Sequence, residues 1–316
     1  MTGAKTQLDI DGIKVEVSNL DKVFYPMTGF TKGQVIDYYV RISPYLLPHL
    51  KGRPITLKRY PNGAGGFFFY EKNCPPHPGW VRTTAVPRSE GGEISYCVID
   101  SLPSLIWAAN LADLELHTFL HRAPGLNRPT ALAFDLDPGA PADLVSCCEV
   151  AVELYDLFAA LKMECYPKTS GSKGIQVYVP LNTSTTYEKT KAFAHAVAEL
   201  LERKSPGRIV SKMLKVLRKG KVLVDWSQND SHKTTVNVYS LRAVDRSFVS
   251  TPVTWDEVRK AIRAKRASSL QFEPQDVLRR VKSKGDLFAP VLTVQQKLPS
   301  LSALSATQSA GKSSSK

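Results

Sequence analysis

Residues 131–139, which read ALAFDLDPG, constrain the fold of this chain more than any other stretch. The apolar start predicts a short buried strand that ends at Pro138 and Gly139. Alternate side chains of a strand point to the same face, so Asp135 and Asp137 project together. Because neighbouring carboxylates repel each other, a pair of divalent cations beside them would relieve the repulsion and support phosphoryl or nucleotidyl transfer. The alternative interpretation is an exposed Asp-x-Asp in a turn.

The net charge favours a polyanionic partner. Lys and Arg together number 42 against 29 Asp and Glu, which gives a formal net charge of +13. Nucleic acid is the first hypothesis for such a surface, because a basic patch is the electrostatic footprint of phosphate binding. A basic surface kept for solubility is the alternative. Charge alone does not separate DNA, RNA and acidic membranes.

The length and the cysteines limit the class of protein. A chain of 316 residues can bury a large core, either as one domain or as two joined lobes. No apolar run approaches the ~18 residues of a membrane span, and residues 1–8 lack a signal-peptide core. We therefore expect a cytoplasmic protein without a membrane partner.

The five cysteines are scattered and contain no Cys-x-x-Cys pair, so we expect neither a disulfide framework nor a zinc site.

The N-terminal part of the chain carries a phosphate-site pattern. Residues 8–17 alternate as in a hairpin, and a helix is predicted from Thr31 onward. Lys32 falls in the first turn of that helix, where free N–H groups and the helix dipole favour an anion. The four aromatics of residues 67–70 are predicted to divide evenly between core and surface, and the exposed pair would stack on bases.

The second half of the chain adds further candidates. The strand pattern of residues 114–120 places His117 on a polar face. Residues 168–174 form a small-residue loop that could cradle phosphates, although no Walker A glycine precedes it and a strand follows it. Residues 212–221 are strongly basic, and Asp225 then ends an apolar strand as a third carboxylate.

Several segments, in order from about residue 13 to residue 290, resemble the polymerase domain of bacterial ligase D, a member of the archaeo-eukaryotic primase superfamily. The segments that carry the resemblance are NLDKVFYP (19–26), KRYPNG (58–63), FYEKN (69–73), ELH (115–117), FDLDP (134–138), TSGSKG (169–174), VDWSQN (224–229), YSLR (239–242) and TWDE (254–257).

The resemblance implies an α/β (α+β) fold, in which an RRM-like catalytic sheet of the primase type has an N-terminal lobe packed against it. We expect the polymerase domain to span residues 1–293, with a DNA-binding lobe over about 1–100 and a catalytic lobe over about 101–293. Residues 294–316, rich in Ser, Ala, Gln and Lys, are predicted to be a disordered tail.

The resemblance also implies the roles of individual residues. The metal-binding and catalytic carboxylates are Asp135, Asp137 and Asp225, which would hold two divalent ions, Mn²⁺ or Mg²⁺. The contacts to the incoming nucleotide are His117, Ser170, Lys173, Arg242, Gln228 and Arg218. The contacts to DNA and to a downstream 5′-phosphate are Asn19, Lys22, Lys32 and Lys58, with Phe69 and Tyr70 stacking on the template base.

The implied function is template-directed gap filling at DNA ends in non-homologous end joining or gap repair, with a preference for ribonucleotides. The implied partners are NTP or dNTP, gapped or broken DNA with a 5′-phosphate, Ku and a separate ATP-dependent ligase, at the bacterial nucleoid. The alternatives are a stand-alone primase, a metal-dependent nuclease and a non-catalytic nucleic-acid binder. The chain has no Lys-x-Asp-Gly ligase motif, so we expect a stand-alone polymerase or an excised domain, and the Ser/Lys-rich end favours a natural C-terminus.

Overall fold

The computed structural model describes residues 5–88 and 90–305, which form two compact units. Unit 1 contains the chain up to Leu126 and takes in Thr234–Thr251 and Phe272–Asp286; unit 2 contains the rest. The predicted lobe boundary near residue 100 therefore differs from the observed division. After Leu126 the chain contributes two further segments to unit 1. A change in local composition cannot predict such segments, because they join unit 1 through contacts with residues distant in the sequence.

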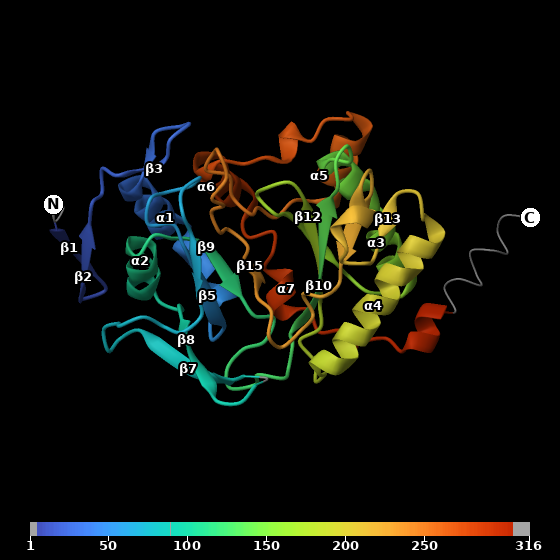
Figure 1. The fold of residues 1–316 in the computed structure, drawn as a ribbon, viewed down its shortest axis with the longest axis horizontal. Coiled ribbons are helices and arrows are strands. Elements are labelled where there is room, and N and C mark those ends of the chain that lie inside the picture. The colour runs from blue at the N-terminus through green and yellow to red at the C-terminus, as the bar shows by residue number, and fades with distance from the viewer. Residues whose placement is uncertain (1–4, 89, 306–316) are drawn as a thin grey trace, which may run out of the picture. The chain divides into compact units, whose positions relative to one another are not determined.

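Unit 1 is built on a six-stranded antiparallel sheet, whose strands are drawn from blue to green in Figure 1 except for β15, which is orange. Strand β5 lies near its centre, because it pairs with β8, β9 and β6. The strands of this sheet are β15 (Thr235–Val236), β9 (Asp113–Thr118), β5 (Pro54–Arg59), β8 (Glu93–Val98), β7 (Arg82–Pro87) and β6 (Phe69–Glu71).

Three helices belong to unit 1: α1 (Lys32–Leu50), α2 (Leu102–Asn110) and α6 (Pro274–Lys284), of which α2 and α6 both pack against α1. The predicted start of α1 is confirmed, since Thr31 caps it and forms a capping box with Gln34.

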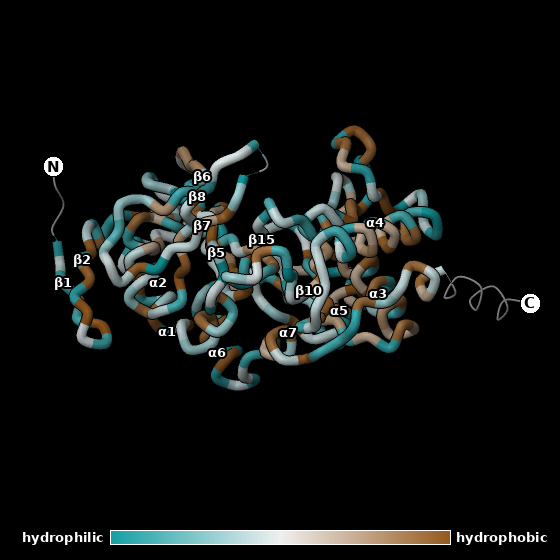
Figure 2. Tube along the Cα trace, turned by 90° about the horizontal axis from the view of Figure 1, so that it is seen from below, coloured by the Kyte–Doolittle hydropathy of each residue, from teal (hydrophilic) through white to brown (hydrophobic). Residues whose placement is uncertain are grey.

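The predicted N-terminal hairpin is also confirmed as β1 (Lys5–Ile10) and β2 (Ile13–Ser18). Hydrophobic and hydrophilic residues alternate along β2 (Figure 2), and its Val15 and Val17 are buried. A short pair, β3 (Val23–Tyr25) and β4 (Phe30–Thr31), precedes α1.

Unit 2 is built on a five-stranded sheet with β10 at its centre. All its pairs are antiparallel except β13 with β14. In order across the sheet, the strands are β11 (Tyr166–Thr169), β12 (Ile175–Pro180), β10 (Ala131–Pro138), β14 (Val222–Asp225) and β13 (Ile209–Val210). The mixed α/β class predicted from the resemblance is confirmed.

Two long helices support this sheet, α3 (Leu144–Ala160) and α4 (Tyr187–Lys204). Phe134 of β10 packs on Phe158 of α3, with ring centroids 5.7 Å apart. Since neighbouring residues of a strand face opposite ways, Asp135 and Asp137 lie on the face away from α3. The remaining helices of unit 2 are η1 (Lys215–Arg218), α5 (Trp255–Arg263), η2 (Ser268–Leu270) and α7 (Pro290–Thr293).

Three predictions require correction. Cys74 and Cys97 form a disulfide, because the backbone N–H of Cys74 donates to Ser95 on β8 and brings the two cysteines together. The aromatics of residues 67–70 do not divide evenly: three are exposed and one is half-buried. Part of the predicted disordered tail is packed, since Gln296 hydrogen-bonds to unit 2 and Leu304 is buried. The rest of that tail, residues 306–316, lies outside the described residues.

No helix within residues 5–88 and 90–305 is long and apolar enough to cross a membrane.

Candidate active site

A row of polar side chains crosses the sheet of unit 2. Asp135 on β10 lies opposite Asp225 on β14 and, on its other side, opposite Gln176 on β12. Gln176 lies in turn opposite Lys168 on β11, whose Nζ donates to the Gln176 Oε1 at 2.6 Å. Directly paired residues share a face, so the row runs from two carboxylates through an amide to a fully buried ammonium. Asp137 lies on the same face as Asp135.

Asp135 lies in an unfavourable electrostatic environment. Burial, and then the nearby Asp137 and Asp225 carboxylates, raise its pKa to about 7, although Gln176 and Lys168 act in the opposite direction. Its Oδ1 is buried without a hydrogen-bond partner among the described residues. A buried, unpaired carboxylate oxygen is costly, so this position calls for a cation.

Asp225 is held in place by its own loop. The backbone N–H and the hydroxyl of Ser227 both donate to its Oδ1, at 2.8 and 2.6 Å. Gln228, predicted as a nucleotide contact, donates from Nε2 to the Asp225 Oδ2 at 3.0 Å. These bonds fix the carboxylate before any ligand arrives, which is the preorganisation that a charged site needs.

The donor set fits a hard divalent cation. Carboxylate oxygens suit Mg²⁺ and Mn²⁺, and the orphan Asp135 Oδ1 supplies a ligand with no competing bond. Within the part of the chain that the structure describes, no group of three or more His, Cys, Asp or Glu side chains is placed so that it could hold a metal ion. Mg²⁺ is commonly bound by one or two carboxylates together with water and substrate phosphates, so an open set of carboxylates matches this mode.

The loop between β11 and β12 closes tightly beside the acidic row. The Ser170 hydroxyl accepts the N–H groups of Ser172 and Gly174, at 3.2 and 3.1 Å. A Cβ on Gly174 would lie 2.1 Å from the Leu136 carbonyl oxygen, so only glycine allows this approach to β10. Lys173 is exposed and lines a pocket of about 410 Å³ that also contains Asp143, the N-cap of α3.

Arg218, the other predicted nucleotide contact of unit 2, ends η1. Its Nη2 donates to the carbonyl of Met213 at 2.6 Å, and its Nε is buried without a partner among the described residues. The backbone of the following turn bonds to residue 139, since Gly139 donates to the Lys221 carbonyl at 2.8 Å. This turn therefore adjoins the end of β10.

A second polar cluster forms around Glu115 in unit 1. Its Oε2 lies 3.0 Å from His117 Nε2, 3.1 Å from Lys58 Nζ and 3.2 Å from Arg242 Nε. Its Oε1 accepts hydrogen bonds from the Tyr60 hydroxyl and from the N–H of residue 243, both at 3.1 Å. One buried carboxylate thus positions two predicted nucleotide contacts, His117 and Arg242, and one predicted DNA contact, Lys58.

Burial outweighs the bond to Glu115 in setting the protonation state of His117. Burial alone would raise the pKa of Glu115, but the His117 hydrogen bond and the charges of Arg242, His117 and Lys58 hold it well below its usual range. Burial lowers the pKa of His117 despite its bond to Glu115. When His117 is neutral and its Nε2–H donates to the Glu115 carboxylate, its Nδ1 is a hydrogen-bond acceptor.

A third cluster pairs Lys22 with Lys32 at the start of α1. The Lys32 N–H donates to the Lys22 carbonyl at 2.8 Å, and Lys22 Nζ donates to Pro61 and Asn62. Gly63 makes this possible, since its φ is +82° and an added Cβ would lie 2.5 Å from the Phe24 carbonyl oxygen. Asn19 closes the turn before Lys22 by accepting the Lys22 N–H at 3.0 Å.

Lys32 is the unusual member of this pair. Its side chain is 4% exposed, and no carboxylate lies within 4.0 Å of its ammonium among residues 5–88 and 90–305. Burial, and then the charge of Lys22, lower its pKa to about 8. A buried ammonium beside another cation at a helix N-terminus has the electrostatics of an anion site.

The aromatic segment of unit 1 is open to solvent. Tyr70 is 55% exposed, and Phe69 is half-buried with the Arg59 guanidinium 5.3 Å from its ring centroid. Lys58 Nζ lies 4.8 Å from the ring centroid of Phe68 and 5.5 Å from that of Tyr70. Exposed rings among cations form a stacking surface of the kind that binds bases.

Sequence reasoning placed carboxylates and cations but missed the residues that hold them. Glu115, Gln176 and Lys168 were not among the predicted site residues. Strand alternation was the available signal, since it puts Glu115 on the same face as His117 and Gln176 at a paired position of the central sheet. The predicted residues fall into four groups and one single residue. The groups are the acidic row with the 170–174 loop, the Glu115 cluster, the Lys22–Lys32 pair with Asn19, and the aromatic segment with Phe69 and Tyr70; Arg218 lies apart at the end of η1.

Comparison with known proteins gives consistent matches. A family model described as the LigD primase-polymerase domain matches residues 31–288. The chain is 40% identical over 281 residues to the multifunctional non-homologous end joining protein LigD of Mycolicibacterium smegmatis, covering 88% of this chain and 36% of that protein. It is 31% identical over 274 residues to the bifunctional LigD of Bacillus subtilis, covering 86% of this chain and 43% of that protein.

A solved structure agrees with these matches. The polymerase domain of Mycobacterium tuberculosis ligase D in complex with DNA aligns with a TM-score of 0.81 and 38% identity, covering 89% of this chain and 98% of that one. The fold and these matches define a nucleotidyltransferase of the DNA-directed polymerase class. More particularly, the chain belongs to the LigD primase-polymerase domain family, and it spans about 36% of the length of the mycobacterial relative.

Proposed function

We propose that this chain is the gap-filling polymerase of bacterial non-homologous end joining or gap repair, which extends a primer 3′-hydroxyl across a short gap. The observation that carries the proposal is the unpaired, buried carboxylate oxygen of Asp135 opposite Asp225. The similarity to a polymerase domain solved in complex with DNA, together with the net charge of +13, supports DNA as the polyanionic partner.

The family is metal-dependent, and Asp135, Asp137 and Asp225 are the residues proposed to hold two divalent ions, Mn²⁺ or Mg²⁺. When bound, such ions lower the pKa of an attacking hydroxyl and neutralise triphosphate charge. The chain itself contributes the fixed orientation of Asp225 through Ser227 and Gln228. It also contributes an acidic face on β10, where Asp135 and Asp137 are half-buried.

The proposed nucleotide contacts come from two clusters. In unit 2, Lys173 and Arg218 are proposed to supply positive charge for phosphates beside the Ser170 loop. In unit 1, Arg242 is proposed to contact the triphosphate. The Nδ1 acceptor of His117 is proposed to accept the 2′-hydroxyl of a ribonucleotide, which would give a preference for NTP over dNTP.

The proposed DNA contacts lie in unit 1. The Lys22–Lys32 pair is proposed to bind a downstream 5′-phosphate, with Asn19 and Asn62 orienting the lysines. Phe69 and Tyr70 are proposed to stack on the template base. Lys58 would support those rings through its cation–π contacts, because its ammonium is already paired with Glu115.

In this proposal the chain acts at the bacterial nucleoid in the cytoplasm, with Ku holding the ends and an ATP-dependent ligase sealing the product. The test is extension of a primer on gapped DNA with each NTP and dNTP in Mg²⁺ or Mn²⁺. Templated addition of one nucleotide per gap position supports the proposal. Shortening of the primer would indicate a nuclease, and product formed without any primer would indicate a primase.

A further inference from the structure

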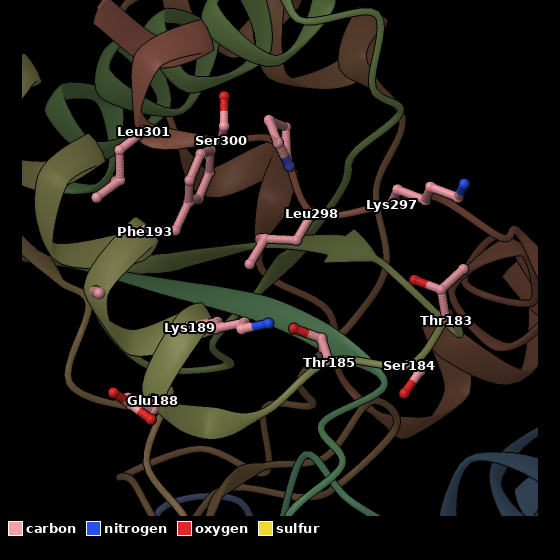
Figure 3. A pocket seen from close by; sticks show the side chains of 12 residues that line it. Thr183, Ser184, Thr185, Glu188, Lys189, Phe193, Lys297, Leu298, Ser300 and Leu301 are labelled. Atoms are coloured by element: carbon pink, nitrogen blue, oxygen red, sulfur yellow. The ribbon is translucent and has the colours of Figure 1, made fainter.

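Unit 2 contains a second cavity that none of the proposed polymerase contacts lines. It has a volume of about 670 Å³ and lies between the N-terminal end of α4 and the segment Lys297–Leu301 (Figure 3). Phe193, Leu298 and Leu301 give it an apolar side. Small-molecule sites usually enclose about 300–1,000 Å³ and combine an apolar lining with a few polar groups, so this cavity has the size and composition of such a site.

One polar group in this cavity lacks a partner. Thr185 is 8% exposed, and its Oγ1 is buried with no hydrogen bond among the described residues. Leaving a buried hydroxyl unpaired is costly, so native structures rarely do so without a reason. In Figure 3 the Thr185 hydroxyl and the Lys189 ammonium point toward one another at one end of the cavity.

The same end of the cavity favours an anion. Helix α4 is 18 residues long, and Thr185 and Lys189 lie at its N-terminal end, where the helix dipole is positive. Lys297 also lines the cavity, but its ammonium points away from Thr185 in Figure 3. The Glu188 carboxylate also lines the cavity but points away from the Thr185 hydroxyl in Figure 3.

We propose that this cavity binds a small organic phosphate. The Thr185 hydroxyl donates to a phosphate oxygen, Lys189 pairs with the phosphate charge, and an apolar body of the ligand lies against Phe193 and Leu298. The site is separate from the proposed polymerase function, and its occupancy does not require nucleotide, DNA or divalent metal.

The experiment titrates the full chain calorimetrically with phenyl phosphate, inorganic phosphate and benzyl alcohol. Phenyl phosphate carries both the anion and the apolar body, and the other two probes carry one each. We expect phenyl phosphate to bind at least about tenfold more tightly than either, because the ring burial and the charge-assisted contacts act together. Failure of phenyl phosphate to bind, or equal binding of inorganic phosphate, would overturn the proposal.

Variants localise the binding. Thr185→Val keeps the shape and removes the hydroxyl, which we expect to weaken binding by about two- to tenfold; Lys189→Gln should weaken it by about tenfold. The matched control is Lys204→Gln, an exposed lysine in the last turn of the same helix, which should bind as the wild type does. Lys189 is exposed, so its variant tests the proposal even if Thr185→Val unfolds. Unchanged binding by Lys189→Gln, or competition by NTP with Mn²⁺, would contradict the assignment.

Discussion

Asp135 of β10 lies directly opposite Asp225 of β14, and Gln176 connects Asp135 to the buried ammonium of Lys168. The row contains two carboxylates but only one cation, so the negative charge near Asp135 is not fully neutralised. Burial, and then the charges of Asp137 and Asp225, raise the pKa of Asp135 to about 7. In the proposed function, a divalent ion supplies the missing charge, so the fold is destabilised at this position until the ion binds.

The first prediction concerns the stability of the metal-free protein. Burial and the neighbouring carboxylates raise the folded-state pKa of Asp135 above its usual value of 3.8. The free energy of unfolding should therefore fall as the pH rises from about 4 to about 7, because the unfolded state loses this proton first. Asp135→Asn should therefore raise the free energy of unfolding by about 1–3 kcal/mol at pH 8 and by less at pH 5. Urea denaturation in EDTA measures this difference.

The control for this experiment is Asp156→Asn, at an exposed position of α3. It should leave the free energy of unfolding nearly unchanged at both pH values. Mn²⁺ should stabilise the wild type more than Asp135→Asn, since ligands stabilise the state that binds them. If Asp135→Asn does not raise the free energy of unfolding at pH 8 above that of Asp156→Asn, the charge imbalance at Asp135 is contradicted.

The second prediction treats Glu115 as a positioning residue. Glu115→Gln removes the carboxylate that holds His117, Arg242 and Lys58, so the KM for NTP should rise about tenfold or more. Steady-state insertion kinetics measure this. Glu71→Gln is the matched control, because Glu71 pairs with Arg59 in the same sheet but does not contact His117. Similar KM values for the two variants would remove the special role of Glu115.

The third prediction concerns the sugar. If His117 accepts the 2′-hydroxyl, UTP should be inserted in preference to dTTP when the two compete opposite adenine. His117→Phe should reduce this preference by lowering UTP use more than dTTP use. Manganese is expected to support faster insertion than magnesium. Equal or better use of dTTP by the wild type would refute the sugar assignment.

The fourth prediction concerns the 5′-phosphate. Wild type should bind gapped DNA at least about tenfold more tightly with a 5′-phosphate than without one, at fixed salt. Burial and Lys22 lower the pKa of Lys32 to about 8, so this preference should decline as the pH rises above 8 and Lys32 loses its charge. Fluorescence anisotropy at pH 7 and pH 9 measures both effects.

Lys32→Met is the variant that separates this site from general lysine–backbone attraction. Its DNA-free form should gain about 1–3 kcal/mol of stability near pH 7, because the depressed pKa means that charging Lys32 costs folding energy there. It should also lose the preference for the 5′-phosphate, whereas Lys51→Met at the other end of α1 should keep it. Should wild type bind both DNAs equally, the pocket does not exist. Should Lys32→Met still discriminate, the pocket lies elsewhere.

Local sequence rules predicted much of this fold. Strand alternation located β10 and its two aspartates, and the pattern after Thr31 located the start of α1. The same rules could not pair β10 with β14 and β12, because register depends on partners distant in the chain. For this reason the Asp225–Asp135–Gln176–Lys168 row was not predicted.

The Glu115 cluster and the disulfide were missed for a related reason. Glu115 acquires its role only when residues 242 and 243 return beside β9, more than a hundred positions later. Cys74 and Cys97 are separated by 23 positions, and cysteine spacing alone does not reveal that β8 brings them together. Both features depend on contacts between residues that are distant in the sequence, whereas a motif describes only residues that are close in the sequence.

The most direct test of the account is single-nucleotide insertion into 5′-phosphorylated gapped DNA by the wild type and by Asp135→Ala, Asp137→Ala and Asp225→Ala, with the affinity for the same DNA measured alongside. The account predicts that each substitution slows insertion at least about a hundredfold, since the proposed metal ligands contribute several kcal/mol to the barrier, and leaves DNA affinity near wild type. Substantial insertion by Asp137→Ala would contradict the proposed metal site.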